Sequence, residues 1–141
     1  MAALSLSPQR NRLGLYFRTL PNGYFQTEHV VAFLRDLLRH FRGRVIVVWD
    51  GWKPHAAAAR IVDSPRLETV KLPGYAPELN PVEQLWNRLK WGHLANSAPA
   101  DAQELHEQLR PLLNQTARNI PQLQSYWNGA KLTPHQLKLR R

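Results

Sequence analysis

The sequence contains no cysteine and a single methionine among its 141 residues. The absence of cysteine excludes disulfide scaffolds, thiol nucleophiles, redox motifs and thiolate zinc sites. No apolar run approaches the ~20 residues that span a bilayer, and the first residues lack the charged start and long apolar stretch of a signal peptide. We therefore expect no membrane partner, and a reducing cytoplasm fits the composition.

Acidic residues are also scarce. Ten Asp and Glu stand against nineteen Lys and Arg, which gives a formal net charge of +9. Such an excess attracts polyanions, so nucleic acid is the first partner to test. A basic protein without such a partner is the alternative that composition leaves open. Glycine-rich phosphate loops, nucleophile-elbow serines and zinc-protease helix motifs are missing from the sequence, so those enzyme classes have no support.

The apolar pattern predicts an α/β fold with a mixed sheet. Strands are expected at residues 2–6, 13–19, 45–50 and 67–72, and helices at 27–41, 55–60, 81–93 and after residue 101. The first two strands read as a hairpin. The run at residues 45–49 lacks polar alternation, which is typical of a strand covered on both faces.

Helix boundaries follow from capping and turn residues. Thr27 is the expected N-cap of the first long helix, and Pro81 suits the first turn of a later one. Asp101 with Glu104 resembles a capping box. Pro111 and Pro121 are each expected to break or restart the helical pattern that follows.

Asp50 and Glu83 are the carboxylates that stand out by position. Asp50 ends the most apolar strand, and ligands in open α/β sheets gather at the carboxyl ends of strands. Capping the next helix is its alternative role. Glu83 lies in a first helical turn, where the macrodipole favours an acid by about 0.3–1 kcal/mol. It lines up with Asn87 and Lys90 at helical spacing. This polar stripe is either a solvated helix face or the border of a cleft.

A strand-end carboxylate and a later helical one can face each other across a sheet edge. Divalent ions such as Mg²⁺ are held by one or two carboxylates with waters and substrate phosphates. Two such ions, about 3.5–4 Å apart, stabilise the attacking and leaving oxygens of a phosphodiester displacement. Asp50 and Glu83 are therefore candidates for a shared metal site.

The residues around both carboxylates resemble the DDE transposases of the mariner-like superfamily, and most closely the bacterial insertion sequence 630 branch. The first block runs from Val47 through Asp50 to His55. The second runs from Leu72 to Lys90 and follows the pattern P-x-Y-x-P-x-L-N-P-x-E-x-x-W-x-x-L-K. Between Asp50 and Glu83 lie 32 residues, close to the family's spacing.

The resemblance implies an RNase H-like fold and a catalytic site for DNA cleavage and strand transfer. Asp50 and Glu83 map to the second and third catalytic acids, which bind two Mg²⁺ or Mn²⁺ ions in an intact site. His55 maps near the metal or donor DNA, and Asn80 positions the helix that carries Glu83. The implied DNA-contact candidates are Lys53, Tyr75, Asn87 and Lys90.

One departure concerns the first catalytic acid. No acidic residue precedes Glu28, so the family's first Asp, its strand and the N-terminal helix-turn-helix have no counterpart. We therefore expect residues 1–115 to be an N-terminally truncated RNase H-like core and residues 116–141 a helical, basic tail. The chain would be a second reading frame, a decayed copy or the product of a start-site error, and inactive or nearly so alone.

Transposon ends and target DNA are the partners that the resemblance implies, with an upstream transposase fragment or a second copy of the chain. A missing strand leaves a sheet edge open to such pairing. The implied location is the bacterial cytoplasm, in association with the nucleoid. A non-catalytic, basic DNA-binding or assembly module with the same fold is the competing hypothesis.

Weaker features carry two interpretations each. Trp49, Trp52 and Trp91 would stack on unpaired bases or pack in the fold. Asp63 and Glu68 are expected to be loop and edge-strand charges, either of which would pair with Arg66. Four basic residues near the C-terminus are candidates for phosphate contacts or belong to a solvated end: Lys131, Lys138, Arg140 and Arg141.

Overall fold

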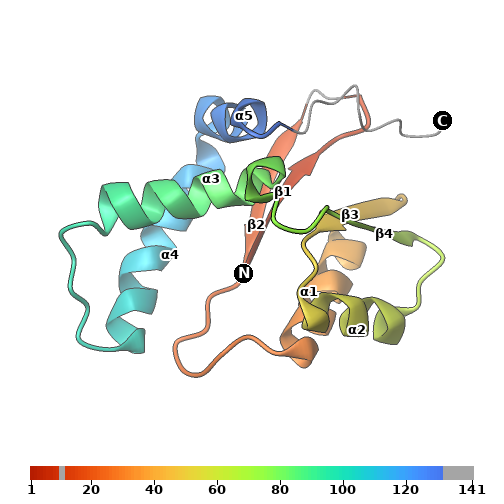
Figure 1. Ribbon diagram of the computed structural model, residues 1–141, viewed down its shortest axis with the longest axis horizontal. Helices are drawn as coiled ribbons and strands as arrows, with labels where there is room; N and C mark the ends of the chain where they lie inside the picture. Colours follow the sequence, from red (N-terminus) through yellow and green to blue (C-terminus); the bar gives the residue numbers. More distant parts are fainter. Residues whose placement is uncertain (10–11, 132–141) are drawn as a thin grey trace. The chain divides into compact units, whose positions relative to one another are not determined.

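A computed structural model describes residues 1–9 and 12–131 of the chain. The chain divides into two compact units, Met1–Gly23 with Pro77–Arg141, and Tyr24–Ala76. We call the first the hairpin unit and the second the crossover unit. The elements of both are labelled in Figure 1.

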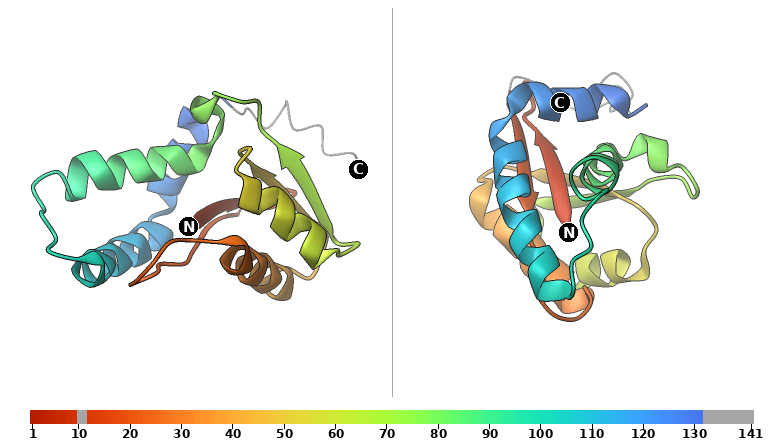
Figure 2. Two further views of the ribbon diagram at one scale, coloured as in Figure 1. Left: turned by 60° about the horizontal axis from the view of Figure 1, so that its bottom comes forward. Right: turned by 90° about the vertical axis from the view of Figure 1, so that its left-hand side faces the viewer.

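The hairpin unit begins with two antiparallel strands, β1 (Ala2–Leu6) and β2 (Leu13–Phe17). Ala2 pairs with Phe17 and Leu6 with Leu13, so the expected hairpin is confirmed. The turn after β2 ends at Gly23, whose φ of 86° suits glycine. The chain returns to this unit through a short 3-10 turn (Pro77–Leu79) and the helices α3 (Pro81–Arg88), α4 (Ala102–Arg118) and α5 (Ile120–Gly129). These helices surround the hairpin (Figure 2).

A leucine cluster holds the hairpin unit together. Leu85, Leu113 and Leu123 are fully buried, and Tyr126 packs with them. Burial raises the pKa of Tyr126 above its ordinary value of 10 despite the nearby Arg88 charge. The inward faces of β2, α3, α4 and α5 all contribute to this core, which is the main source of the unit's stability.

Pro111 does not break the helix in which it lies, contrary to the sequence prediction. Helix α4 runs through it from Ala102 to Arg118. Pro111 and Glu107, whose carbonyl loses its helical partner, are both exposed, so water can satisfy that carbonyl. Leu113 is buried beyond the proline, and its packing holds the next turn in place. Pro121 behaves as expected, because it lies in the first turn of α5.

Along the chain, the crossover unit is a succession of helix, strand, helix and strand. It comprises α1 (Thr27–His40), β3 (Val45–Trp49), α2 (Lys53–Val62) and β4 (Leu67–Lys71). The two strands are parallel, with Val45 opposite Leu67 and Trp49 opposite Lys71. Helices α1 and α2 pack against each other and lie on the same side of the strand pair (Figures 1 and 2).

Helix α1 supplies most of the buried side chains in this unit. Six of its apolar residues are buried at helical spacing: Val30, Val31, Phe33, Leu34, Leu37 and Leu38. The predicted N-cap is shifted by one residue, since Gln26 occupies that position and Thr27 is the first helical residue. The backbone N–H of Gln26 donates to His29 Nδ1 over 3.0 Å. The imidazole therefore accepts the N-cap N–H, the role that the N3 side chain has in a capping box.

Arg66 caps the C-terminal end of α1. Its guanidinium donates to the carbonyls of Leu38, Phe41 and Arg42 over 2.7, 2.9 and 3.1 Å. These groups lie at or beyond the helix end, where carbonyls lack helical partners and a cation is favoured. Among the described residues, Arg66 forms no ion pair with Asp63 or Glu68, in contrast to the sequence prediction. Glu68 pairs with Arg44 over 3.2 Å.

Strand β3 is less covered than its apolar sequence predicts. Ile46 is 37% exposed and Val70, on the same face of the strand pair, is 40% exposed. Both helices of this unit lie on the opposite side of the pair, so one face of the ladder lacks a helix within residues 24–76. The elements of residues 24–76 by themselves do not provide the cover on both faces that the sequence predicts for this strand.

The predicted fold class is confirmed at the level of its elements. The described residues form a mixed α/β structure, with one antiparallel and one parallel pair of strands and helices around them. This arrangement is consistent with an RNase H-like fold. The expected boundary at residues 115 and 116 falls inside α4 and stays a prediction. Among the described residues, no helix is long and apolar enough to cross a membrane.

Candidate functional site

Asp50 follows β3 directly, at the carboxyl end of the parallel pair. Its Oδ1 accepts a hydrogen bond from the backbone N–H of Trp52 over 3.0 Å. This local turn fixes the carboxylate next to the start of α2. Trp52 is the N-cap of that helix, so the alternative role of Asp50 as N-cap is not observed.

His55 lies against the same carboxylate oxygen. Its Nδ1 is 2.9 Å from Asp50 Oδ1, an ion pair when the imidazole is protonated. Nδ1 is buried and makes no well-directed hydrogen bond in the part of the chain that is described, so the contact is chiefly electrostatic. His55 therefore lies beside the candidate metal ligand Asp50, and its expected place near the metal or donor DNA stays a prediction.

Two tryptophans hold the His55 ring in place. The Trp49 ring stacks on it at 4.6 Å between centroids with an interplanar angle of 1°, and Trp52 meets it edge-on at 5.1 Å. Trp49 is thus a packing residue here, whereas Trp52 is still 42% exposed. This aromatic box explains why a histidine can be held at the surface beside Asp50.

The donor set at Asp50 fits a hard divalent cation. The side chain of Asp50 is 59% exposed, and its contacts with Trp52 and His55 both use Oδ1. The second oxygen therefore remains available to a ligand such as Mg²⁺ or Mn²⁺, since these ions prefer carboxylate oxygens with water completing the shell. Within residues 1–9 and 12–131, no three His, Asp or Glu side chains form a metal cluster, so Asp50 would need further ligands.

A cation also lies beside Asp50. Lys71 is the last residue of β4 and pairs with Trp49. A Cβ placed on Gly51 would be 2.8 Å from Lys71 Cε and 3.3 Å from its Nζ. The lysine side chain therefore crosses over Gly51, and a side chain at this position would displace its far end.

Glu83 lies in the first turn of α3, as predicted. Asn80 is the N-cap of this helix, and its Oδ1 accepts from the N–H of Val82 over 3.1 Å. The N–H of Glu83 donates to the Asn80 carbonyl over 3.0 Å. The expected positioning role of Asn80 is thus visible in its hydrogen bonds.

Asp50 belongs to the crossover unit and Glu83 to the hairpin unit. Each carboxylate is placed within its own unit, next to the start of a helix. Their convergence on shared metal ions stays a prediction.

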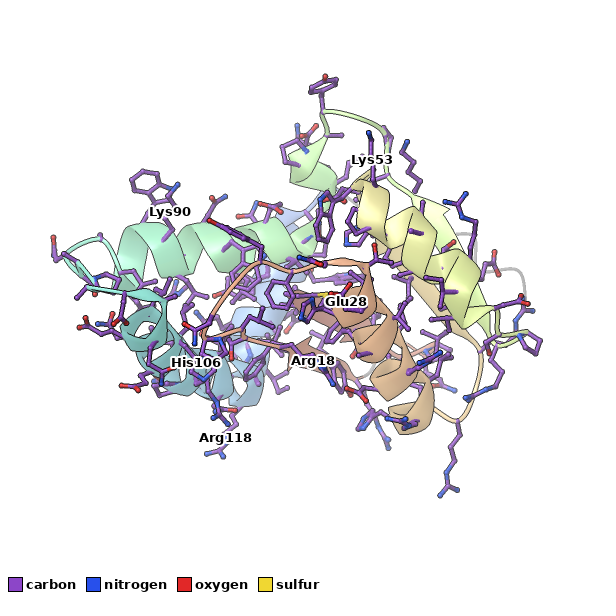
Figure 3. The ribbon with its side chains drawn as sticks, turned by 90° about the horizontal axis from the view of Figure 1, so that it is seen from below. Arg18, Glu28, Lys53, Lys90, His106 and Arg118 are labelled. Atoms are coloured by element: carbon purple, nitrogen blue, oxygen red, sulfur yellow. The ribbon has the colours of Figure 1, made fainter. Side chains whose placement is uncertain are left out.

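The four DNA-contact candidates are all exposed: Lys53, Tyr75, Asn87 and Lys90. Lys53 is the first residue of α2 and extends away from it (Figure 3). Tyr75 is fully exposed at a φ of 57°, a strained backbone for a tyrosine. Packing explains neither the full exposure of Tyr75 nor its positive φ.

Asn87 and Lys90 follow Glu83 along the same helical segment. The predicted helix continues to His93, but residues Leu89–His93 form a π-helix, a wider turn that changes the register after Arg88. Lys90 Nζ lies 4.9 Å from the ring centroid of Trp91, which is 70% exposed. Lys90 and Trp91 thus form an exposed cation–aromatic pair.

The basic tail is only partly described. The backbone N–H of Lys131 donates to the Glu78 carbonyl over 3.0 Å, and its side chain is exposed. Lys138, Arg140 and Arg141 lie outside the described residues, so their expected phosphate contacts stay predictions.

Sequence reasoning missed Lys71 and Gly51. Gly51 lies in the first motif block but carries no functional side chain, Lys71 lies just before the second block, and their contact depends on the register of β4 against β3. The signal available was that Lys71 lies near the carboxyl end of the predicted strand 67–72, as Asp50 does at the end of the predicted strand 45–50.

The sequence was also compared with known proteins. The chain matches the family described as DDE superfamily endonuclease over residues 7–106, more than two thirds of its length. The protein therefore belongs to the DDE superfamily endonucleases, a class of enzymes that act on DNA. The match includes Asp50, His55, Asn80 and Glu83. Neither the curated proteins nor the solved structures contain a significant match.

Proposed function

We propose that this protein acts in DNA transposition, as a DDE transposase of the mariner-like superfamily and of its bacterial insertion sequence 630 branch. In this proposal Asp50 and Glu83 are metal ligands for cleavage of transposon ends and transfer of the 3′-hydroxyl to target DNA. The observation that supports it best is the strand-end position of Asp50, with one oxygen engaged and the other available. Family membership supports the nucleic-acid substrate.

Each residue of the site has a separate task. Trp52 N–H and His55 hold Asp50 Oδ1 and so orient Oδ2. Asn80 fixes the helix start from which Glu83 extends. Two bound Mg²⁺ or Mn²⁺ ions would supply charge neutralisation for the attacking and leaving oxygens. Lys53, Tyr75, Asn87 and Lys90 would bind DNA around these carboxylates in the bacterial cytoplasm.

The 141-residue polypeptide is expected to cleave DNA barely or not at all by itself. The sequence has no acidic residue before Glu28, so it carries two of the three acids that the proposed chemistry uses. A third carboxylate, from an upstream transposase fragment or a second copy, would be needed for full activity. Mn²⁺-dependent nicking by the purified polypeptide, lost in Asp50→Ala, would contradict this expectation.

Metal binding is the direct test of the proposed site. At a Mn²⁺ concentration about 100 times its Kd, binding to the folded state stabilises a protein by about 2.7 kcal/mol. We expect Mn²⁺ to raise the unfolding temperature of the wild type and to do so much less in Asp50→Asn and Glu83→Gln. Thermal unfolding with and without Mn²⁺ measures this difference.

Matched control variants distinguish the loss of Asp50 or Glu83 from the loss of any exposed carboxylate. Asp63→Asn removes an exposed carboxylate of the crossover unit at a left-handed position that asparagine tolerates. Glu107→Gln removes an exposed carboxylate of α4. Both controls should retain the full Mn²⁺ effect, and equal losses in the controls and in the site variants would refute the site.

A non-catalytic, basic DNA-binding or assembly module is the second candidate. The net charge of +9 favours it, as does the lack of a three-ligand metal cluster among the described residues. Such a module would bind DNA in a salt-dependent manner with no Mn²⁺ effect on its unfolding temperature. The experiment above therefore distinguishes the two candidates.

A further inference from the structure

A carboxylate and a lysine, Asp50 and Lys71, lie at the same end of the parallel strand pair β3 and β4. Trp49 and Lys71 are register partners. The N–H of Leu72 donates to the Trp49 carbonyl over 2.7 Å, which extends the ladder to its edge. The residue after Trp49 is Asp50, so Asp50 and Lys71 are held at one end of a hydrogen-bonded pair.

The course of the lysine side chain brings its charge to the Asp50 loop. An added Cβ on Gly51 would lie 3.3 Å from Lys71 Nζ and 2.8 Å from Cε. The ammonium therefore lies against the backbone that immediately follows Asp50. A lysine at the end of an edge strand would otherwise extend freely into solvent, where it merely discourages edge pairing.

The charge of Lys71 is available to a ligand. Lys71 is exposed, and the described part of the chain shows no ion pair to it. Asp50, which precedes Gly51 in the chain, already uses Oδ1 for Trp52 and His55. A lysine ammonium is a compact point charge that binds phosphate oxygens well.

We propose that Lys71 binds a backbone phosphate of the nucleic acid at Asp50, and that Gly51 is required because any side chain there displaces Lys71. This inference rests on the proposed function, since it takes DNA as the ligand. Lys71 is a binding residue in this scheme: it holds the substrate strand against the carboxylate and takes no part in proton or electron transfer.

The test measures binding of a fluorescent DNA duplex by the full chain over a series of salt concentrations. A lost phosphate contact lowers the slope of log K against log[salt] by about 0.9. We expect Lys71→Gln to lower the slope by that amount and the affinity by about tenfold. Lys71→Arg should restore most of the affinity, because the charge returns.

Arg42→Gln is the matched control. Arg42 is exposed and precedes β3, at the opposite end of the strand pair from Asp50. Arg42→Gln removes the same charge as Lys71→Gln. Because Arg42 lies far from Asp50 along the strands, Arg42→Gln should change the slope and the affinity much less than Lys71→Gln does. Equal effects of the two variants would overturn the inference, because they would show diffuse attraction to the whole basic surface.

Gly51→Ala tests the packing half of the inference. Because the clash is with the far end of a flexible side chain, the fold should survive, which circular dichroism checks. Gly51→Ala should weaken DNA binding in the wild type and have no further effect in Lys71→Gln. Additive losses in the double variant would refute the coupling of Gly51 to Lys71.

The outcomes also separate this inference from the proposed function. A wild type that binds no DNA would overturn both. A wild type that binds DNA and retains the Mn²⁺ effect at Asp50, with Lys71→Gln equal to Arg42→Gln, would overturn the inference alone.

Discussion

The hairpin unit and the crossover unit bury their apolar residues in different ways. In the hairpin unit, strands and helices enclose one leucine cluster, with Leu85, Leu113 and Leu123 fully buried. In the crossover unit, the buried residues lie mainly on α1, and Ile46 and Val70 leave one strand face partly exposed. The charged groups near Asp50 therefore sit on the less enclosed scaffold. Hydrogen bonds, above all those of Arg66, replace part of the missing packing there.

The largest expected effect tests this contrast in burial. Leu113→Ala leaves a cavity in a closed core, so it should lower the free energy of unfolding by about 3 kcal/mol. Ile46→Ala should cost about 1 kcal/mol, because part of that side chain already contacts water. Urea denaturation measures both values. Equal losses would show that the β3 face is as enclosed as the leucine cluster and would remove the contrast.

Arg66 provides the next test, because it concerns the hydrogen bonds of the crossover unit. Arg66→Gln leaves the carbonyls of Leu38, Phe41 and Arg42 without their charged donor. We expect a loss of about 2 kcal/mol in the free energy of unfolding. Arg66→Lys should restore only part of it, since an ammonium lacks the planar fork.

Arg39→Gln is the control for that measurement. Arg39 forms an exposed pair with Asp36 on α1, and such pairs contribute about 0.5 kcal/mol or less. If Arg39→Gln and Arg66→Gln cost the same, the guanidinium at the end of α1 has no special role.

The smallest expected effect concerns Tyr75. Its positive φ of 57° strains a residue with a side chain, whereas asparagine tolerates this region. Tyr75→Asn should therefore raise the free energy of unfolding by about 0.5 kcal/mol. It should also weaken DNA binding if the exposed ring stacks on a base. Denaturation and DNA titration of the same variant measure the two effects.

Tyr24→Asn serves as the comparison for Tyr75→Asn. Tyr24 is 88% exposed in the same unit and has no positive φ. It should show neither the gain in stability nor the loss in DNA affinity. A gain of equal size in both variants would attribute the effect to the removal of an exposed ring.

Local chemistry explains which parts of this structure could be predicted. The helical spacing of apolar residues identified α1, and the predicted place of Pro81 in the first turn of α3 is confirmed. The Asp101 cap is confirmed too, since its Oδ1 accepts from the N–H of Glu104 over 2.8 Å. Each of these features depends on residues within a few positions of one another.

Features that depend on distant residues could not be predicted. Arg66 reaches carbonyls more than twenty residues earlier, and the contact of Lys71 with Gly51 depends on strand register. Pro111 was misjudged because burial of Leu113 on the next turn outweighs the local cost of a proline. Asp50 and Glu83 were identified as candidates by position and motif, which say nothing of the distance between them.

The two units can complete their folding at different times during protein synthesis, because one is contiguous in sequence and the other is not. Residues 24–76 are contiguous, so the crossover unit has all its partners once Ala76 has left the ribosome. Strands β1 and β2 emerge earlier, yet their apolar face must wait for α3, α4 and α5. During translation of residues 24–76 the hairpin therefore lacks the helices that bury its apolar face, and this face is a binding surface for a ribosome-associated chaperone.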